Sequence, residues 1–321
     1  MSKVTLNNVI IVVKRWKKKM KNKVVIIGCG NVGMSYAYAL LNQKTPVTEL
    51  VLIDVNEERA LGEAMDLNHG LPFGPSKINI YAGSYKDCEN AKIVCIAAGA
   101  NQENGETRMD LIHKNSKIFK SIVDSVMSSG FDGVFLVATN PVDVMTYLTW
   151  KYSCLPTTRI VGTGTILDTA RLRYLIGDKL QINSKSIHAY VMGEHGDSEF
   201  VPWSLAKVGL ESIDKYLNES QKEELYVKVR DAAYDIISKK GNTSYGIGMS
   251  LVRITNAILG NENTILAVSS YDENNKIFVG GPSIVNRNGI RKRIFIELSK
   301  DEEEKMQKSI DVIKDAIKSI K

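Results

Sequence analysis

The stretch that decides the fold of this chain is residues 24–33, which read VVIIGCGNVG. The short apolar run predicts a buried strand, and it leads into Gly28, Gly30 and Gly33. Residues 32–41 then carry apolar side chains at helical spacing. Glycines at such a turn let the backbone approach a ligand closely, and free N–H groups at the start of the helix attract an anion. Strand, glycines and helix together predict a site for the phosphates of a nucleotide.

The rest of the first half repeats this alternation of short apolar runs and amphipathic segments. Further buried strands are expected at residues 50–53, 93–96 and 134–137, and a helix at 57–68. This order is typical of βαβ units and a parallel sheet. We therefore predict the α/β class, with a Rossmann-type doubly wound parallel sheet followed by a mixed α/β catalytic domain.

The second half is less regular but ends in a well-marked helix. Helices are expected near residues 166–179, 220–240 and 243–259, followed by strand-like runs through Val268, Val279 and Ile294. Ser299 and Glu302 form a capping box for the last helix. Its buried stripe is predicted to consist of Met306, Ile310, Ile313, Ile317 and Ile320.

The chain has 321 residues and a net charge of +6, and the excess of positive charge lies in one short tail. Residues 1–19 hold six basic residues and no acid, so the remainder is formally neutral. The apolar run at 9–13 is too short for a membrane span and precedes the basic cluster, the reverse of a secretory signal. We read the tail as an extension outside the fold, with Met20 as a natural start; a membrane-surface or nucleic-acid segment is the alternative. For the body of the chain we predict neither a membrane nor a nucleic-acid partner.

The four cysteines show no pattern of a metal site or a disulfide framework. Cys29, Cys88, Cys95 and Cys154 contain no CxxC pair and have no histidine at zinc-ligand spacing. We expect reduced thiols, mostly packing groups, in a cytoplasmic protein without a metal.

The nucleotide prediction is strengthened by an acid at the end of the next strand. Asp54 follows Gly33 by 21 residues, where a carboxylate accepts hydrogen bonds from an adenosine ribose and repels a 2′-phosphate. The predicted cofactor is therefore NAD rather than NADP. Arg59, one turn further on, is able to reach adenine or phosphate. The alternative is a glycine-rich turn beside a solvated aspartate.

This interpretation divides the chain into three parts. Residues 1–19 are a basic N-terminal extension, 20–162 an NAD-binding Rossmann domain and 163–321 a catalytic α/β domain. The length exceeds what one hydrophobic core usually organises, which agrees with two lobes.

An enzyme that oxidises an alcohol with a nicotinamide cofactor needs a group that takes the proton, and histidine suits this task at neutral pH. The chain has four histidines: His69, His113, His188 and His195. His195 lies in the glycine-flanked turn 193–197, GEHGD, where a side chain can be held at a cleft. His69 and His113 are expected at surface or packing positions. His195 is therefore the candidate acid–base group.

Asp168 and Arg171 supply two further groups that this chemistry needs. A carboxylate usually orients a proton-shuttling imidazole, and an arginine fork binds the carboxylate of a 2-hydroxy or 2-oxo acid. Three residues apart on a helix, the two side chains are about 60° apart and share a face. Taken alone, such a pair is more often a surface salt bridge, so the assignment depends on the other residues.

Residues 99–108 follow a strand and are predicted to form a mobile lid that opens into a helix. Arg108 at its end would enter the site on closure and stabilise charge on the substrate oxygen. Asn140 follows the strand at 134–137, at the edge of the sheet where doubly wound folds bind ligands. Its amide can hold either a substrate oxygen or the nicotinamide.

Several of these motifs occur together in one known family. GCGNVG at 28–33, AGANQ at 98–102 with GETR at 105–108, NPVD at 140–143, LDTAR at 167–171 and GEHGD at 193–197 resemble the L-lactate dehydrogenase family, over residues 22–320. The resemblance implies that His195 is the proton donor and acceptor, Asp168 its orienting partner, Arg171 the carboxylate fork, Arg108 the lid arginine and Asn140 a substrate contact. The implied cofactor contacts are Gly28, Gly30, Val32, Gly33, Asp54, Arg59, Tyr85, Gly99, Ala100, Ala138, Asn140 and Ile247.

Within this resemblance, residue 102 separates two substrates. A second carboxylate in a water-poor pocket needs another cation, and malate dehydrogenases carry arginine where this chain has the neutral Gln102. Thr243 also matches the lactate pattern beside the substrate. The expected activity is reversible hydride transfer between NADH and pyruvate, giving L-lactate in fermentation. A malate dehydrogenase and a non-catalytic NAD-binding protein are the alternatives, although the intact site residues argue against the second.

A second anion site is implied by Arg173 and His188. Arg173 points about 200° away from Arg171 on the helix, so it serves a different ligand. The pair matches the residues that bind fructose 1,6-bisphosphate between subunits of allosteric bacterial L-lactate dehydrogenases. This implies activation of a homotetramer by the sugar bisphosphate; the alternative is a surface arginine and an unrelated histidine.

Overall fold

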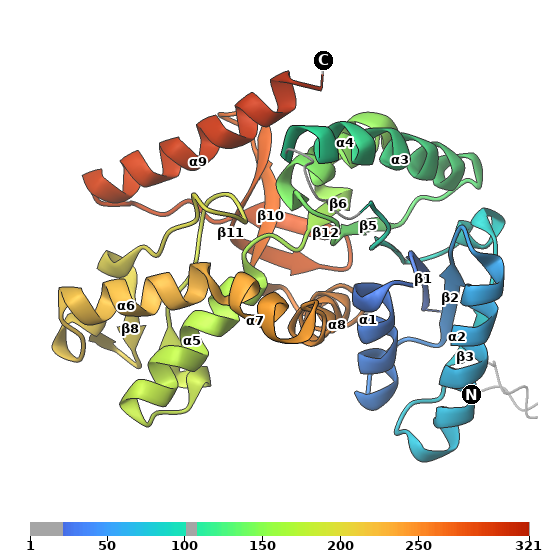
Figure 1. The fold of residues 1–321 in the computed structure, drawn as a ribbon, viewed down its shortest axis with the longest axis horizontal. Coiled ribbons are helices and arrows are strands. Elements are labelled where there is room, and N and C mark those ends of the chain that lie inside the picture. The colour runs from blue at the N-terminus through green and yellow to red at the C-terminus, as the bar shows by residue number, and fades with distance from the viewer. Residues whose placement is uncertain (1–21, 101–107, 321) are drawn as a thin grey trace, which may run out of the picture.

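The computed structural model describes residues 22–100 and 108–320, which form two halves joined by one large sheet (Figure 1). The first half, blue to green in Figure 1, carries α1 to α4, and the second half, yellow-green to red, carries α5 to α9. Helix α8 lies between the two halves and packs against α1. The predicted extension at residues 1–19 lies outside the described residues.

The large sheet has the strand order β12-β11-β10-β6-β5-β4-β1-β2-β3 in the described residues. Strands β6 to β3 in this order are parallel, whereas β10, β11 and β12 are antiparallel to their neighbours. Because the order reverses between β1 and β4, the carboxyl ends of these strands border the crevice in which doubly wound folds bind ligands. The strands of this sheet are β1 (Lys23–Ile27), β2 (Glu49–Ile53), β3 (Asn79–Ala82), β4 (Ile93–Ile96), β5 (Val134–Val137), β6 (Ile160–Gly162), β10 (Thr264–Asp272), β11 (Ile277–Asn286) and β12 (Gly289–Arg293).

Helices connect the strands, and a small antiparallel sheet lies in the second half. The small sheet consists of β7 (Ile187–His188), β8 (Lys207–Val208) and β9 (Glu211–Ser212). The helices are α1 (Asn31–Asn42), α2 (Glu57–Gly70), α3 (Arg108–Ser128), α4 (Val142–Ser153), α5 (Ile166–Leu180), α6 (Glu219–Arg230), α7 (Ala232–Lys240), α8 (Tyr245–Leu259) and α9 (Lys300–Lys318).

The parallel strands are apolar on both faces, so helices cover the sheet on both sides. In β1, Val24 and Ile26 belong to one core with α1, α2 and α8, whereas Val25 and Ile27 belong to a second core with α3, α4 and α9. A third cluster packs α5 and α6 against the small sheet. These cores fix the carboxyl ends of the strands, from which the candidate site is built.

Helix α9 has the predicted cap and the predicted buried stripe. Ser299 and Glu302 form both hydrogen bonds of the capping box. Ile310, Ile313 and Ile317 are buried in the second core, with the flanking residues of the stripe partly buried there. Both sequence predictions for this helix are confirmed.

The predicted α/β class with a doubly wound parallel sheet is confirmed, but some elements differ. The single helix expected at 220–240 is divided into α6 and α7 by Asp231 (φ −86°, ψ −4°), whose carboxylate lies 2.8 Å from Nε of Arg230. Neither glycine nor proline marks this break. Strand β12 ends one residue before Ile294. The sequence pattern does not predict β3, which is only partly buried, unlike the fully buried β4 and β5 of the same length. It also does not predict β6, which has only three residues.

Cys29, Cys88 and Cys95 are buried and Cys154 is exposed, all as free thiols. Burial raises the pKa of Cys29 and of Cys88 to about 12, so these thiols stay protonated and act as packing groups. Among residues 22–100 and 108–320, no helix combines the length and apolar character needed to cross a membrane.

Candidate active site

Gly28 and Gly33 are required by the geometry of the turn after β1. Gly28 has φ +103°, and a Cβ on it would lie 2.5 Å from the backbone nitrogen of Ala98. A Cβ on Gly33 would lie 2.0 Å from the carbonyl oxygen of Gly28. Without side chains at these positions, the start of α1 packs closely against the ends of β1 and β4.

Gly30 serves a different purpose, because it leaves the turn open. Nothing in the described part of the chain lies within 4 Å of a Cβ built on Gly30. The first turn of α1, which follows Gly30, has neither a side-chain cap nor an acidic residue. Within residues 22–100 and 108–320 no side chain caps its N–H groups, which leaves them for an anion, and the helix dipole also favours an anion there. This cradle fits the pyrophosphate of a dinucleotide such as NAD.

Asp54 is held in place by the glycine turn itself. Its Oδ2 accepts a hydrogen bond from the N–H of Cys29 at 2.7 Å, and its Oδ1 accepts one from the N–H of Asn56 at 3.0 Å. The carboxylate is thereby fixed at the end of β2, with lone pairs left for ribose hydroxyls. Arg59 is exposed on α2, where its Nε lies 3.8 Å from Glu63.

The opposite wall of the crevice is formed by the segments that follow β4 and β5. A Cβ on Gly99 would lie 2.5 Å from Cγ2 of Thr139, so these segments are in close contact. The buried side chain of Asn115 accepts a hydrogen bond from the N–H of Ala100 at 2.8 Å and donates one to the carbonyl oxygen of Asn140 at 3.2 Å. The backbone of both segments is therefore fixed, and Asn140 remains exposed at the sheet edge.

The remaining predicted cofactor and substrate contacts lie in segments that border the same strand ends. Helices α1 and α8 approach closely here, because a Cβ on Gly248 would lie 2.8 Å from the backbone of Ser35. The half-buried members of this set are Val32 on α1, Tyr85 after β3, Ala138 after β5, Thr243 before α8 and Ile247 on α8.

The structure brings His195, Asp168 and Arg171 together. Nδ1 of His195 lies 2.7 Å from Oδ2 of Asp168, and Nη1 of Arg171 donates a hydrogen bond to Oδ1 of Asp168 at 2.9 Å. The Asp168 side chain is 2% exposed, whereas those of His195 and Arg171 are 26% and 14% exposed. The imidazole is therefore held through Nδ1, which leaves Nε2 and the other guanidinium N–H groups for a substrate.

Hydrogen bonds connect the turn that carries His195, and the segment before it, to three other elements, directly or through Asp143. The His195 N–H donates to Oδ2 of Asp143 on α4 at 2.9 Å, and the hydroxyl of Ser269 on β10 donates to Oδ1 of the same carboxylate at 2.5 Å. Thr165, at the start of α5, donates to the carbonyl oxygen of Val191 at 2.7 Å. The turn is thus connected to α4, to β10 and to the helix that carries Asp168.

The charges of the site favour a protonated imidazole. Burial alone would lower the pKa of His195, but the charge and hydrogen bond of Asp168, with smaller contributions from Glu199 and Asp143, raise it to about 9. Burial alone would raise the pKa of Asp168, but His195 and Arg171 hold it below its usual value. At neutral pH the pair is therefore an imidazolium beside a carboxylate, the form that can donate a proton.

Arg173 contacts other residues than Arg171 does. Its Nε donates to the carbonyl oxygen of Ala189 at 2.9 Å, and its guanidinium lies 4.7 Å from the ring centre of Tyr190. His188 is exposed at the end of β7, directly before Ala189. Arg173 and His188 therefore flank the same short strand.

The side chains of two predicted site residues lie outside the described part of the structure. Gln102 lies outside the described residues, and of Arg108 only the backbone is described, as the first residue of α3. His69 and His113 are both exposed, which confirms surface positions for them.

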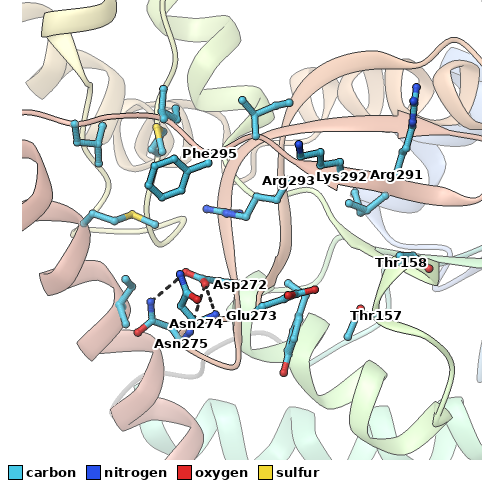
Figure 2. Close-up of a pocket in the computed structure, with 18 residues that line it drawn as sticks. Thr157, Thr158, Asp272, Glu273, Asn274, Asn275, Arg291, Lys292, Arg293 and Phe295 are labelled. Carbon is cyan, nitrogen blue, oxygen red and sulfur yellow. Dashed lines mark hydrogen bonds between the residues drawn. The ribbon is translucent and has the colours of Figure 1, made fainter.

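A pocket of about 590 Å³ lies elsewhere, between the β10–β11 turn, β12 and α9 (Figure 2). Arg293 extends into it and donates to the carbonyl oxygen of Val279 at 2.7 Å and to the hydroxyl of Ser270 at 2.9 Å. Residues 272–275 line the pocket as an internally hydrogen-bonded turn. None of the predicted site residues lines this pocket. The candidate active site is therefore based on the contacts among His195, Asp168 and Arg171.

Some residues that shape the site escape sequence reasoning because they act through contacts distant in the chain. Asn115 and Ser269 belong to no motif, whereas Asp143 ends the NPVD motif and could have been singled out on that basis. Glu199 follows the GEHGD motif by two residues. It is 3% exposed, and its Oε2 lies 4.0 Å from Nδ1 of His195.

Two family models together match almost all of the described residues. Residues 22–162 match the lactate/malate dehydrogenase NAD-binding domain, and residues 165–321 match the lactate/malate dehydrogenase alpha/beta C-terminal domain. The chain is 53% identical over 312 residues to an L-lactate dehydrogenase of Geobacillus sp. (strain WCH70), with 94% of this chain and 97% of the relative covered. It is 51% identical over 310 residues to L-lactate dehydrogenase 2 of Bacillus cereus (strain ATCC 10987 / NRS 248), with 94% and 98% covered.

Solved structures resemble both halves of the chain. A lactate dehydrogenase from a Medee basin deep-sea metagenome library matches with a TM-score of 0.92 at 48% identity, over 94% of this chain and 99% of that one. The minor L-lactate dehydrogenase from Enterococcus mundtii in the ligands-bound form matches with a TM-score of 0.92 at 46% identity, over 94% and 99%.

Proposed function

This chain belongs to the lactate/malate dehydrogenase family, and from that premise we propose that it is an NAD-dependent L-lactate dehydrogenase that interconverts pyruvate and L-lactate. It is an oxidoreductase with NAD as its cofactor. The observation that carries the proposal is the contact of 2.7 Å between His195 and the buried Asp168, with Arg171 beside it. This set supplies a proton donor and a carboxylate-binding cation within one site.

In the proposed reaction His195 exchanges the proton. Held at Nδ1 by Asp168, the imidazolium donates its Nε2 proton to the keto oxygen of pyruvate, and in the reverse direction the neutral ring takes the hydroxyl proton of lactate. The remaining N–H groups of Arg171 hold the substrate carboxylate. NADH, when bound, supplies the hydride that reduces the carbonyl carbon. Gly30 and the start of α1 would hold its pyrophosphate, and Asp54 its adenosine ribose.

The lid residues complete the proposal. Arg108 stabilises negative charge on the substrate oxygen, and the neutral Gln102 leaves no cation for a second carboxylate. Asn140 and Thr243 contribute further polar contacts to the substrate. Pyruvate is therefore the proposed substrate, and oxaloacetate the runner-up.

The experiment that tests this function is NADH oxidation with pyruvate and, separately, with oxaloacetate. We expect kcat/KM for pyruvate to exceed that for oxaloacetate. A preference for oxaloacetate would contradict the proposed role of Gln102. Turnover of neither compound, with NADH still bound, would favour a non-catalytic NAD-binding protein.

The cofactor preference depends on Asp54. We expect Asp54→Ser to lower the preference for NAD over NADP by about tenfold or more, because hydrogen bonds to a charged group are worth about 1.5–3 kcal/mol and the repulsion of a 2′-phosphate is lost. The measurement is kcat/KM for NADH and NADPH with saturating pyruvate.

Asp66→Asn, at an exposed position on α2, is the matched control and is expected to keep the preference of the unmodified enzyme. Because Asp54 also accepts two backbone N–H groups, thermal unfolding of each variant is compared first. An unchanged preference in a folded Asp54→Ser protein would show that the ribose assignment is wrong.

We also propose that Arg173 and His188 bind fructose 1,6-bisphosphate and that the sugar bisphosphate activates a homotetramer. Arginine and histidine suit a phosphate. His188 ends β7, and Arg173 on α5 donates a hydrogen bond to the carbonyl oxygen of Ala189, the next residue. Activation requires that the ligand bind the active state more tightly than the inactive one.

Arg173→Gln is expected to abolish the response to fructose 1,6-bisphosphate, because an anion contact of this kind contributes about 1.5–3 kcal/mol to binding. Basal turnover is expected to stay within about twofold of that of the unmodified enzyme. The measurement is initial rate at subsaturating pyruvate against sugar bisphosphate concentration. Lys308→Gln, an exposed cation on α9, is the control. An activation curve identical to that of the unmodified enzyme would contradict the site.

Three further assignments belong to the same proposal. They are the division of the chain after Gly162, a cytoplasmic location and a role in fermentation. The division is supported by β6, which ends at Gly162 as the last of the parallel strands. The location and the role are supported by the likeness to bacterial L-lactate dehydrogenases.

A further inference from the structure

A second buried carboxyl group faces the imidazole on the side of Asp168. Oε2 of Glu199 lies 4.0 Å from Nδ1 of His195, and Glu199 is 3% exposed. A ring nitrogen of His195 and one carboxylate oxygen each of Asp168 and Glu199 all lie within 4.8 Å of one another. The ring therefore has two carboxyl groups beside Nδ1, although the proposed reaction uses only Asp168.

The side chain of Glu199 does not hold the turn in shape. Its backbone does so, because the Glu199 N–H donates to the carbonyl oxygen of Gly196 at 3.1 Å and its carbonyl oxygen accepts the hydroxyl of Tyr226 at 2.8 Å. Oε1 of Glu199 is buried, and among the described residues it has no hydrogen-bond partner. A buried carboxyl without a structural bond calls for another explanation.

The surroundings of Glu199 disfavour its ionised form at neutral pH. Burial and the charge of Asp168 raise the pKa of Glu199 well above its usual range, and Glu194 adds to this. His195 and Arg171 oppose the shift but do not cancel it. From α6, Tyr226 faces it with a phenol whose own pKa is raised by burial. Glu199 is therefore a neutral acid at pH 7 and ionises in the same alkaline range in which His195 loses its proton.

We propose that Glu199 is a positioning residue for the acid–base step, and that its carboxyl group sets the upper pH limit at which His195 still carries a proton. This inference rests on the proposed function of His195. The sign follows from charge: when Glu199 ionises beside the ring, the new negative charge stabilises the imidazolium, so the ring keeps its proton to higher pH than it would beside an uncharged amide. No atom of Glu199 touches the substrate in this scheme, because it lies on the Nδ1 side.

The test compares Glu199→Gln and Glu199→Asp with the unmodified enzyme. The readout is kcat/KM for pyruvate with saturating NADH, measured from pH 6 to pH 11. We expect the alkaline limb of the Glu199→Gln profile to move to lower pH by about one unit, the lower end of the shift that an opposite charge at 4–6 Å produces. Glu199→Asp keeps an ionisable group at greater distance, so its limb is expected between the other two. Glu303→Gln, at an exposed position on α9, is the matched control and should leave the profile unchanged.

A Glu199→Gln limb that coincides with that of the unmodified enzyme, or that moves to higher pH, would overturn the inference. If Glu199→Gln fails to fold, as judged by thermal unfolding, the test uses Glu199→Asp. An alkaline limb of Glu199→Asp that coincides with that of the unmodified enzyme, or lies at higher pH, would then overturn the inference. A purely structural role would lower the melting temperature or kcat at every pH without moving the limb.

A second readout does not require turnover and separates this inference from the proposed function. Diethyl pyrocarbonate acylates histidine only in its neutral form, because the imidazolium has no free lone pair. Peptide mass spectrometry separates the modification of His195 from that of other residues and follows it against pH. We expect His195 of Glu199→Gln to become reactive about one unit lower in pH than in the unmodified enzyme. If neither form reduces pyruvate but this shift is seen, the proposed function fails, whereas the effect of Glu199 on the protonation of His195 is still supported. If pyruvate is reduced but no shift is seen, only the inference fails.

Discussion

Replacing His195 with glutamine is expected to lower kcat for pyruvate reduction about 10³-fold, because a positioned general acid contributes about 10²–10⁴-fold and the amide cannot donate a proton of comparable acidity. The amide still fits beside Asp168, so the effect should be confined to the chemical step. The measurement is single-turnover NADH oxidation at saturating pyruvate, accompanied by NADH binding from fluorescence quenching.

His69→Gln is the matched control for this substitution, since His69 is exposed at the end of α2. Its rate is expected to stay within about twofold of that of the unmodified enzyme, as for most surface substitutions. Retention of more than a tenth of the turnover by His195→Gln would refute the assignment of His195 as the proton donor. Loss of NADH binding in the same variant would point instead to a change in the cofactor crevice.

Replacing Arg171 with lysine is expected to lower kcat/KM for pyruvate about 10³-fold, mainly through KM. Lysine keeps the charge beside Asp168 but loses the planar fork that binds a carboxylate through two parallel hydrogen bonds. Removing such a partner from a buried charge pair lowers affinity by about 2–5 kcal/mol. The measurement is the dependence of initial rate on pyruvate concentration at saturating NADH.

A ketone without a carboxylate separates this effect from general damage to the site. Acetone has no group for the fork, so its slow reduction is expected to change little in Arg171→Lys. Arg253→Lys is the matched control, because Arg253 pairs with Glu262 at 2.7 Å outside the crevice. Equal losses for pyruvate and acetone would show that Arg171 does not act by binding the carboxylate.

The extent to which sequence predicts this structure depends on whether an element is marked locally. The strand before Gly28 and the cap of α9 are fully specified by neighbouring residues, and both are found where expected. The short strand β6 is placed by pairing with β5 and β10, which lie far away in the sequence. The break at Asp231 likewise has no local marker.

In the site, too, contacts between residues close in the sequence could be predicted, whereas contacts between distant residues could not. Asp168 and Arg171 are three residues apart on one helix, so their contact follows from helix geometry. The contact between His195 and Asp168 spans 27 residues and depends on how α5 packs against the following loop. Asn115 and Glu199 belong to no motif, and only the folded chain places them beside the functional residues.

The position of α9 has a consequence for how the protein is made. Ile310, Ile313 and Ile317, near the C-terminus, complete a core that also contains Val25 and Ile27 of the first strand. During synthesis on the ribosome, the nucleotide-binding half therefore emerges with one face of its sheet incompletely covered. That face is closed only after α9 has been translated, so a nascent chain interrupted before α9 carries an exposed apolar surface on which chaperones or aggregation can act.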